Sequence, residues 1–355
     1  MKMPPEGVLI GLIRDILHSS SGEAAVGVAA LDDAAVIECG GDRQLVIASD
    51  FIRGTEFYLF QLGYLDYFDV GYYLAIANIS DMAAMGCTPS GLLTVVRYSK
   101  NMSVTDFEQV FRGIKAAADA YGTQVVGGDT GGYVSDVFSA TAFSIIKRGA
   151  YLTRSGVRDG DLICVTGPLG GAIGALTYFK ELKPKGLQID VSDEQALLQC
   201  WKRPRARVDI GMLLVKHELA TSCMDISDGL KATIDQSSAL AGMKYQLQET
   251  DIPVHESTRK VAELGQLDPV ALALSASVDF ELFFSVSPEK WTKAEEVLAA
   301  HGHHIFQIGR AGRHFGNDLV KKDHTVVPLP GVPWQHQLGD HVKDVVTATT
   351  RKSSL

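Results

Sequence analysis

Aspartates recur in this chain beside glycine, serine and alanine, close to apolar stretches typical of buried strands and helices. A carboxylate buried without a partner is costly, and several gathered in one cleft would repel one another and raise one another's pKa values. Multivalent cations relieve that repulsion, and Mg²⁺ prefers oxygen ligands and accompanies phosphate groups. The pattern therefore predicts an enzyme that uses Mg²⁺ and a nucleotide. The aspartates are Asp32, Asp33, Asp50, Asp81, Asp129, Asp225 and Asp228.

Each aspartate taken alone has a simpler explanation, since aspartate is also common at helix N-caps and in turns. Their recurrence along two thirds of the chain favours a common site. Phosphoryl transfer suits such a site, because it needs in-line positioning, bridging Mg²⁺ ions and positive charge rather than covalent help from the protein. Arg154 lies in the glycine-flanked turn LTRSG, and we expect it to reach a phosphate, although an ordinary surface arginine is the alternative.

Other candidate motifs carry less weight. The GPLGGAIG turn (167–174) is similar to a phosphate-binding loop at a helix start, but it is neither a Walker A motif nor a well-placed G-x-G-x-x-G. Glycines that allow close packing of a strand and a helix explain it at least as well. Cys87 could be a nucleophile, yet a small buried thiol is the simpler interpretation. The HGHH run (301–304) has no trustworthy metal-ligand spacing.

Composition limits the class of protein. The 355 residues suffice for two domains, and the net charge of −9 argues against a nucleic-acid partner. The five cysteines are scattered without a C-x-x-C pair, which indicates reduced thiols. The N-terminal stretch predicts an amphipathic helix rather than a signal peptide, and no apolar run reaches membrane-spanning length. We therefore expect a soluble cytoplasmic protein without a membrane partner.

The order of the expected elements predicts an α/β or α+β fold. In the first half, strands are expected at 44–50, 91–98, 123–129 and 136–149, and helices at 8–18, 69–86 and 104–121. In the second half, we expect strands at 162–167, 244–253, 278–286 and 306–313, helices at 168–179 and 206–219, an exposed connection at 180–194, and a turn followed by a helix within 222–242.

A polar, turn-rich segment at 148–161 suggests the main boundary between domains. We expect an N-terminal domain over 1–150 that binds Mg²⁺ and ATP and mediates dimerisation. A C-terminal domain should follow over 151–327. The last segment, 328–355, is rich in proline, histidine and polar residues and is expected to be an irregular tail.

Five motifs together resemble the thiamine-monophosphate kinase family, within the wider superfamily of aminoimidazole ribonucleotide synthetase-like (PurM-like) ATP-dependent enzymes. They are LDDAAV, ANISDMAAMGCTP, VVGGDT, LTRSGVRDGDLICVTGPLGG and DISDGL, and the similarity runs from about residue 8 to about residue 313. The resemblance implies two α/β domains and nucleotide bound in a cleft between them. It also implies a homodimer in which the N-terminal strands of two subunits form a shared barrel.

The resemblance also implies roles for residues. The implied reaction moves the γ-phosphate of ATP directly onto the phosphate of thiamine monophosphate, giving thiamine diphosphate. Implied Mg²⁺ positions are Asp33, Ser49, Asp50, Asp81, Asp129, Asp225 and Asp228, of which Asp81, Asp225 and Asp228 are the expected catalytic residues. Implied nucleotide contacts are Gly128, Asp129, Arg154 and Ser227.

The acceptor positions depart from the family pattern. Glu56 stands where the family has a substrate-contacting histidine, Val278 replaces a substrate-contacting glutamate, and Trp334 only loosely matches a C-terminal aromatic motif. A second hypothesis therefore keeps the fold and the ATP chemistry but phosphorylates another acceptor, either a phosphate or an amide or carboxylate oxygen that an amine then attacks. A third hypothesis is a non-catalytic nucleotide-binding protein, against which the number of acids argues.

Overall fold

A computed structural model describes residues 6–17, 24–333 and 341–350. Its first six strands form one mixed sheet in the order β1-β2-β3-β6-β4-β5. Only β4 and β5 pair in parallel, and the other neighbours are antiparallel. The strands are β1 (Ala24–Val26), β2 (Ala35–Glu38), β3 (Arg43–Ile52), β4 (Gly91–Tyr98), β5 (Val125–Gly132) and β6 (Val137–Lys147).

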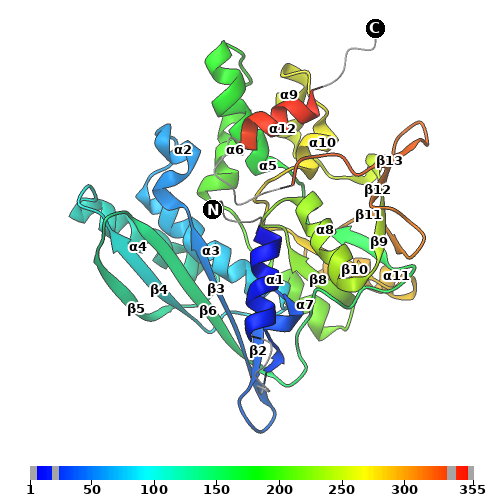
Figure 1. The fold of residues 1–355 in the computed structure, drawn as a ribbon, viewed down its shortest axis with the longest axis horizontal. Helices are drawn as coiled ribbons and strands as arrows, with labels where there is room; N and C mark the ends of the chain where they lie inside the picture. The colour runs from blue at the N-terminus through cyan, green and yellow to red at the C-terminus, as the bar shows by residue number, and fades with distance from the viewer. Residues whose placement is uncertain (1–5, 18–23, 334–340, 351–355) are drawn as a thin grey trace.

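Two helices, α3 (Tyr67–Ala84) and α4 (Val104–Ala120), cover one face of this sheet (Figure 1). α4 begins with a capping box, in which the Ser103 and Asp106 side chains each accept a hydrogen bond from the other residue's backbone. The predicted buried helix at 69–86 is confirmed by α3, which is buried on nearly every side. Within the described ranges, no helix covers the apolar side chains on the other face of the sheet, which include the exposed Phe51, Leu93, Val95 and Ile145.

The second half of the chain forms a seven-stranded sheet in the order β13-β12-β9-β11-β7-β10-β8. Its core strands confirm the expected strands at 162–167, 244–253, 278–286 and 306–313. The strands are β7 (Leu162–Val165), β8 (Ala220–Asp225), β9 (Lys244–Gln248), β10 (Leu282–Val286), β11 (Phe306–Gly312), β12 (Asp318–Val320) and β13 (Val326–Pro328). The two-sheet α/β architecture agrees with the predicted fold class, while the exact domain limits at 150 and 327 stay predictions.

Strand β8 was not predicted, because its sequence ATSCMD looks polar. The structure accounts for the polar residues. The Ser222 hydroxyl shares a hydrogen bond with Ser285 of β10 at 2.7 Å, and the Thr221 hydroxyl donates to Asp161 at 2.6 Å. Polar side chains with satisfied hydrogen bonds can occupy a buried strand at little cost.

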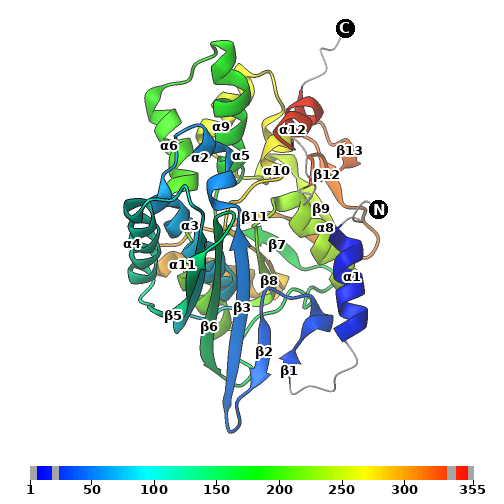
Figure 2. The same cartoon turned by 60° about the vertical axis from the view of Figure 1, so that its left-hand side comes forward.

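Several helices surround the second sheet, and α5, α6 and α9 gather at one end of the molecule (Figure 2). Helix α6 occupies part of the expected connection at 180–194. The segments are α1 (Glu6–Leu17), α2 (Tyr58–Gln61), α5 (Gly171–Leu176) with a π-helical extension (Thr177–Leu182), α6 (Val191–Lys202), α7 (Val208–Lys216), α8 (Leu230–Ala241), α9 (Glu256–Leu264), α10 (Pro269–Leu274), α11 (Trp291–Ala300) and α12 (His341–Thr349).

Helix α12 corrects the prediction of an irregular tail over 328–355. It forms because apolar residues spaced along the tail have a surface to cover. Val345 is fully buried against Ala262 and Leu272 of α9 and α10. Two buried valines within nine residues are a weak periodic signal, which is why the sequence did not reveal the helix.

Helix α3 joins the two halves, because it packs on the first sheet and also against α6, α7 and β8 (Figure 1). Its contact with α7 is so close that a Cβ atom on Gly211 would overlap the carbonyl oxygen of Ala83. Glycine therefore permits backbone contact at this junction. Across the described residues, no helix is long and apolar enough to cross a membrane.

Candidate active site

Three predicted metal-site aspartates, Asp33, Asp81 and Asp225, come together between the two halves. One carboxylate oxygen from each lies within 4.8 Å of the others. Asp33 lies just before β2, Asp81 in the last turn of α3, and Asp225 at the end of β8. Three segments that are remote in sequence thus bring their acids to one point, which we call the acid cluster.

The carboxylates of the acid cluster repel one another when they are ionised. Burial, reinforced by the Asp225 and Asp33 carboxylates, raises the pKa of Asp81 well above its usual range. Burial and the Asp33 charge raise the pKa of Asp225 to about 7. Hydrogen bonds from the Ser80 hydroxyl at 2.6 Å and the Ser227 hydroxyl at 3.1 Å oppose that rise.

Arg154 supplies positive charge beside the acid cluster. Its guanidinium forms an ion pair with Asp33, whose side chain is fully shielded from solvent. It also donates to the carbonyl oxygen of Leu31 at 3.2 Å, and its backbone N–H donates to the Asp32 carboxylate. Its Nε–H is buried without a partner among the described residues, so one donor remains for a ligand.

The donor set of the acid cluster fits a hard divalent cation. Asp33 Oδ2 is buried without a hydrogen-bond partner in the part of the chain that the structure describes. Several carboxylates face one guanidinium, which leaves an excess of negative charge. Such oxygen ligands match Mg²⁺, and a bound cation would offset both the orphan oxygen and the repulsion.

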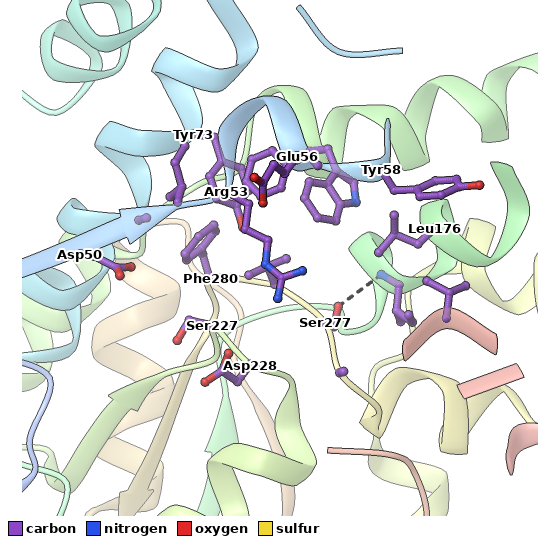
Figure 3. Close-up of a pocket in the computed structure, with 18 of the residues that line it drawn as sticks. Asp50, Arg53, Glu56, Tyr58, Tyr73, Leu176, Ser227, Asp228, Ser277 and Phe280 are labelled. Atoms are coloured by element: carbon purple, nitrogen blue, oxygen red, sulfur yellow. Dashed lines mark hydrogen bonds between the residues drawn. The ribbon is translucent and has the colours of Figure 1, made fainter. Parts of the chain in front are cut away.

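A pocket of about 360 Å³ adjoins this region (Figure 3). Asp50, Ser227 and Asp228 line one part of it, and Figure 3 shows Tyr58 and Leu176 on the side away from Asp50. Aromatic rings pack against one another along its wall at centroid distances of 4.9 to 5.7 Å. These rings belong to Phe57, Tyr73, Trp201 and Phe280.

Two predicted acceptor residues line this pocket. Glu56 approaches from the turn after β3, and Val278 from the loop before β10. Trp334, the third, lies outside the described residues. Asp50 is held near α3, since its backbone N–H donates to the Asn78 side chain at 3.0 Å. The pocket thus adjoins both the implied acceptor residues and the implied metal ligands.

Three predicted site residues lie elsewhere within this chain. Asp129 is exposed and forms an ion pair with Arg97 on β4. The strand register aligns Asp50, Ala140, Thr94 and Gly128 across β3, β6, β4 and β5, which puts Gly128 about 14 Å from Asp50. Because side chains alternate along a strand, Asp129 points to the uncovered face of the sheet, while Asp50 is on the helix-covered side.

Ser49 also points to the uncovered face. Its hydroxyl donates to the Ala140 carbonyl oxygen at 3.0 Å and accepts from Thr141 at 3.0 Å. The expected grouping of all seven metal positions is therefore not present within one chain.

The GPLGGAIG turn serves packing in this structure. The Gly170 N–H donates to the Asp279 carboxylate at 3.0 and 3.1 Å, so a protein acid already occupies the place of a phosphate. Burial raises the pKa of Asp279 to about 7. The sequence analysis did not identify Asp279 or Tyr73 as site residues. Neither lies in a motif that indicates a chemical role before the pocket geometry is known.

Comparisons with known proteins agree with this geometry. The family model for AIR synthase related protein, N-terminal domain, matches residues 31–146. The thiamine-monophosphate kinase of Pyrococcus horikoshii is 30% identical over 279 residues, which cover 77% of this chain and 81% of that protein. The Bacillus subtilis enzyme of that name is 27% identical over 325 residues, covering 90% and 95%. A solved structure, AaThiL complexed with AMPPCP and TMP, has 26% identity and a TM-score of 0.77, covering 95% of this chain and 99% of that one.

Proposed function

The chain belongs to the thiamine-monophosphate kinase family, and from this we propose that it transfers the γ-phosphoryl group of ATP to the phosphate of thiamine monophosphate, giving thiamine diphosphate. One observation carries the proposal within this structure. The acid cluster, which suits a metal–phosphate complex, adjoins an aromatic-lined pocket through Asp50, Ser227 and Asp228. A phosphoryl donor and an organic acceptor could therefore meet at one place.

The metal proposal rests on the acid cluster. Asp33, Asp81 and Asp225 would hold Mg²⁺, with Asp50 and Asp228 as further ligands at the pocket side. When bound there, Mg²⁺ would supply the positive charge that neutralises the phosphate groups during transfer. We assign Asp81, Asp225 and Asp228 as the catalytic acids because they lie where the two substrates would meet.

Arg154 and Ser227 are the proposed nucleotide contacts on this chain. The unpartnered Nε–H of Arg154 can donate to a phosphate oxygen, and a guanidinium suits phosphate geometry. Ser227 lies between the acid cluster and the pocket, where its hydroxyl can move from Asp225 to a phosphate. These residues bind and orient, and the transfer itself is direct and in line, without a covalent enzyme intermediate.

The pocket suits the organic part of thiamine monophosphate. The thiazolium ring of thiamine monophosphate carries a positive charge. Aromatic rings and a carboxylate both attract such a flat organic cation. Glu56 supplies that carboxylate, and Val278 contributes an apolar contact in the same pocket. A carboxylate at position 56 and an apolar residue at position 278 are thus compatible with this acceptor.

We further propose a homodimer in which a second copy supplies Gly128 and Asp129. Within one chain Asp129 faces away from Asp50, so it cannot complete the same metal site. The uncovered sheet face next to Asp129 is apolar, as a buried interface requires, and Ser49 lies on that face as well. The exposed apolar side chains of this sheet face include Ile37, Phe51, Leu93, Val95, Val126 and Ile145.

Complementation tests this arrangement. Asp129→Asn and Asp81→Asn should each inactivate the enzyme. Co-expression of the two variants should restore roughly a quarter of wild-type activity, because half of the dimers then have one intact site. No recovery in a mixed dimer of verified composition would place Asp129 in the site of its own chain or outside the site.

The test of the function is a direct assay of thiamine diphosphate formed from ATP, Mg²⁺ and thiamine monophosphate. Turnover would support the proposal. Absence of turnover with Mg²⁺-dependent ATP binding retained would favour a different acceptor for the same phosphorylation chemistry. ATP binding without transfer or hydrolysis with any acceptor would favour a non-catalytic nucleotide-binding protein.

A further inference from the structure

Tyr73 lines the pocket and has no role in the assignments above. Its side chain is almost fully buried, with 5% exposed. Tyr73, Ala77 and Asp81 follow one another at four-residue intervals along α3, so they share one face of the helix. Ala77 lines the same pocket, and Asp81 belongs to the acid cluster. This face therefore runs from the acceptor pocket to the metal site over about 12 Å.

The Tyr73 ring is held by packing alone. It stacks on Trp201 at 5.7 Å and meets Phe57 and Phe280 edge to face at 4.9 and 5.4 Å. Buried tyrosine hydroxyls usually find a hydrogen-bond partner, yet this hydroxyl has none within residues 24–333. The ring position thus does not depend on the hydroxyl, which is left for a ligand in the pocket.

The other hydroxyls of the pocket are committed or remote. Ser227 is already assigned to the nucleotide and donates to Asp225 at 3.1 Å in its absence, and Ser277 donates to Asp279 at 3.0 Å. Tyr58 lies across the pocket from Asp50 (Figure 3), with the Lys180 ammonium 4.3 Å from its ring centroid. Tyr73 is consequently the pocket hydroxyl that lies near the acids and has a proton to donate.

A phosphate that enters between the aromatic wall and the acids meets the carboxylates of Asp50 and Asp228 and the guanidinium of Arg53, which lines the same pocket (Figure 3). A neutral donor suits that position, because it binds a phosphate oxygen without forming a permanent ion pair with those acids. Burial, reinforced by the Asp50 and Asp228 charges, raises the pKa of Tyr73 well above its usual range. The hydroxyl therefore keeps its proton at neutral pH.

We propose that the Tyr73 hydroxyl positions the acceptor by donating a hydrogen bond to its phosphate. This assignment rests on the proposed function and names the residue that distinguishes a phosphorylated acceptor from its dephosphorylated form. Tyr73 acts on the substrate phosphate, whereas Glu56 and Val278 contact the organic part.

Calorimetric binding of thiamine monophosphate and of thiamine, both with Mg²⁺, tests the proposal. The dissociation constant of thiamine divided by that of thiamine monophosphate measures how much the phosphate contributes to binding. Tyr73→Phe should reduce this ratio roughly 10- to 100-fold, as expected for one lost hydrogen bond to a charged group. Thiamine affinity should stay unchanged, since the ring contacts remain. The control variant Tyr58→Phe removes a pocket hydroxyl on the other side and should leave the ratio unchanged.

Wild-type conversion of thiamine monophosphate, measured in parallel, separates the two hypotheses. A wild-type chain that does not convert this acceptor overturns the proposed function and the role of Tyr73 with it. Conversion by the wild type together with an unchanged ratio in Tyr73→Phe overturns the role of Tyr73 alone. Equal weakening of thiamine and thiamine monophosphate in that variant also overturns it, since the hydroxyl would then serve the shape of the pocket.

Discussion

Asp225→Asn should make the metal-free protein more stable at alkaline pH. Burial in the acid cluster raises the pKa of Asp225 from its ordinary value of 3.8 to about 7. The folded state therefore holds a proton that the unfolded state releases between those values. The contribution of Asp225 to the free energy of unfolding is fully present below pH 3.8 and is lost as pH rises through about 7. The full loss corresponds to about 4 kcal/mol, of which roughly 2 to 3 kcal/mol falls between pH 5 and pH 8.

The substitution has an opposing cost. The Ser80 and Ser227 hydroxyls donate to the Asp225 carboxylate, and a neutral amide accepts more weakly, at about 1 kcal/mol for each bond. The variant should therefore gain about 2 kcal/mol over the wild type at pH 8 and be slightly less stable at pH 5. Since the pKa of Asp81 is raised in part by Asp225, relief at Asp81 would act in the same direction.

Urea unfolding in EDTA at pH 5, 6, 7 and 8, repeated with Mg²⁺, measures these effects. Mg²⁺ should stabilise the wild type at pH 8 and have little effect on Asp225→Asn, which should also lose phosphoryl transfer. Asp279→Asn is a matched control, because burial raises the pKa of Asp279 to the same value outside the acid cluster. It should flatten the pH dependence yet leave stabilisation by Mg²⁺ intact. An Asp225→Asn chain that loses stability as steeply as the wild type, or gains as much from Mg²⁺, would refute the reasoning.

Three further substitutions probe the site. Arg154→Ala leaves the shielded Asp33 carboxylate without its counter-ion, so it should lower the free energy of unfolding, measured in urea, by about 3 to 5 kcal/mol. It should also raise the KM for ATP, and an unchanged KM would exclude Arg154 from the nucleotide site. Glu56→Gln should raise the KM for thiamine monophosphate about fivefold with kcat unchanged, because only an exposed charge is lost; steady-state kinetics with equal KM values would contradict a contact to the cation. Gly229→Ala should cost about 1 to 3 kcal/mol, since Gly229 has φ +88° and a Cβ atom there would overlap the Ser275 carbonyl; an unaltered thermal midpoint would show that the turn adapts.

The acid cluster is the part of the site that sequence reasoning anticipated best. Asp81 and Asp225 end a helix and a strand, and such ends tend to meet at one edge of a layered fold. The outward direction of Asp129 could not be foreseen. It depends on which residue of β5 lies opposite Thr94, and a shift of one residue in that register would turn the side chain to the other face.

Among the elements, long periodic segments were predicted well, while short or polar ones were not. α3 and α4 have continuous apolar patterns and clear caps. β8 escaped prediction because its polar residues are satisfied by distant partners such as Ser285 and Asp161. Tyr73 was missed for a related reason, since it reads as one more buried aromatic until the pocket geometry reveals an unpaired hydroxyl.

The backbone contact between Gly211 of α7 and Ala83 of α3 bears on how the enzyme opens. Helices that touch at their main chains have no side-chain layer through which to slide, so the two halves should move as one body. Substrates must then enter through the rim of the pocket, whose lining includes the turn at Glu56, Tyr58 and Val342 of α12. Turnover would be limited by local rearrangement of that rim, and its rate should respond to changes in α12 more than to changes between the halves.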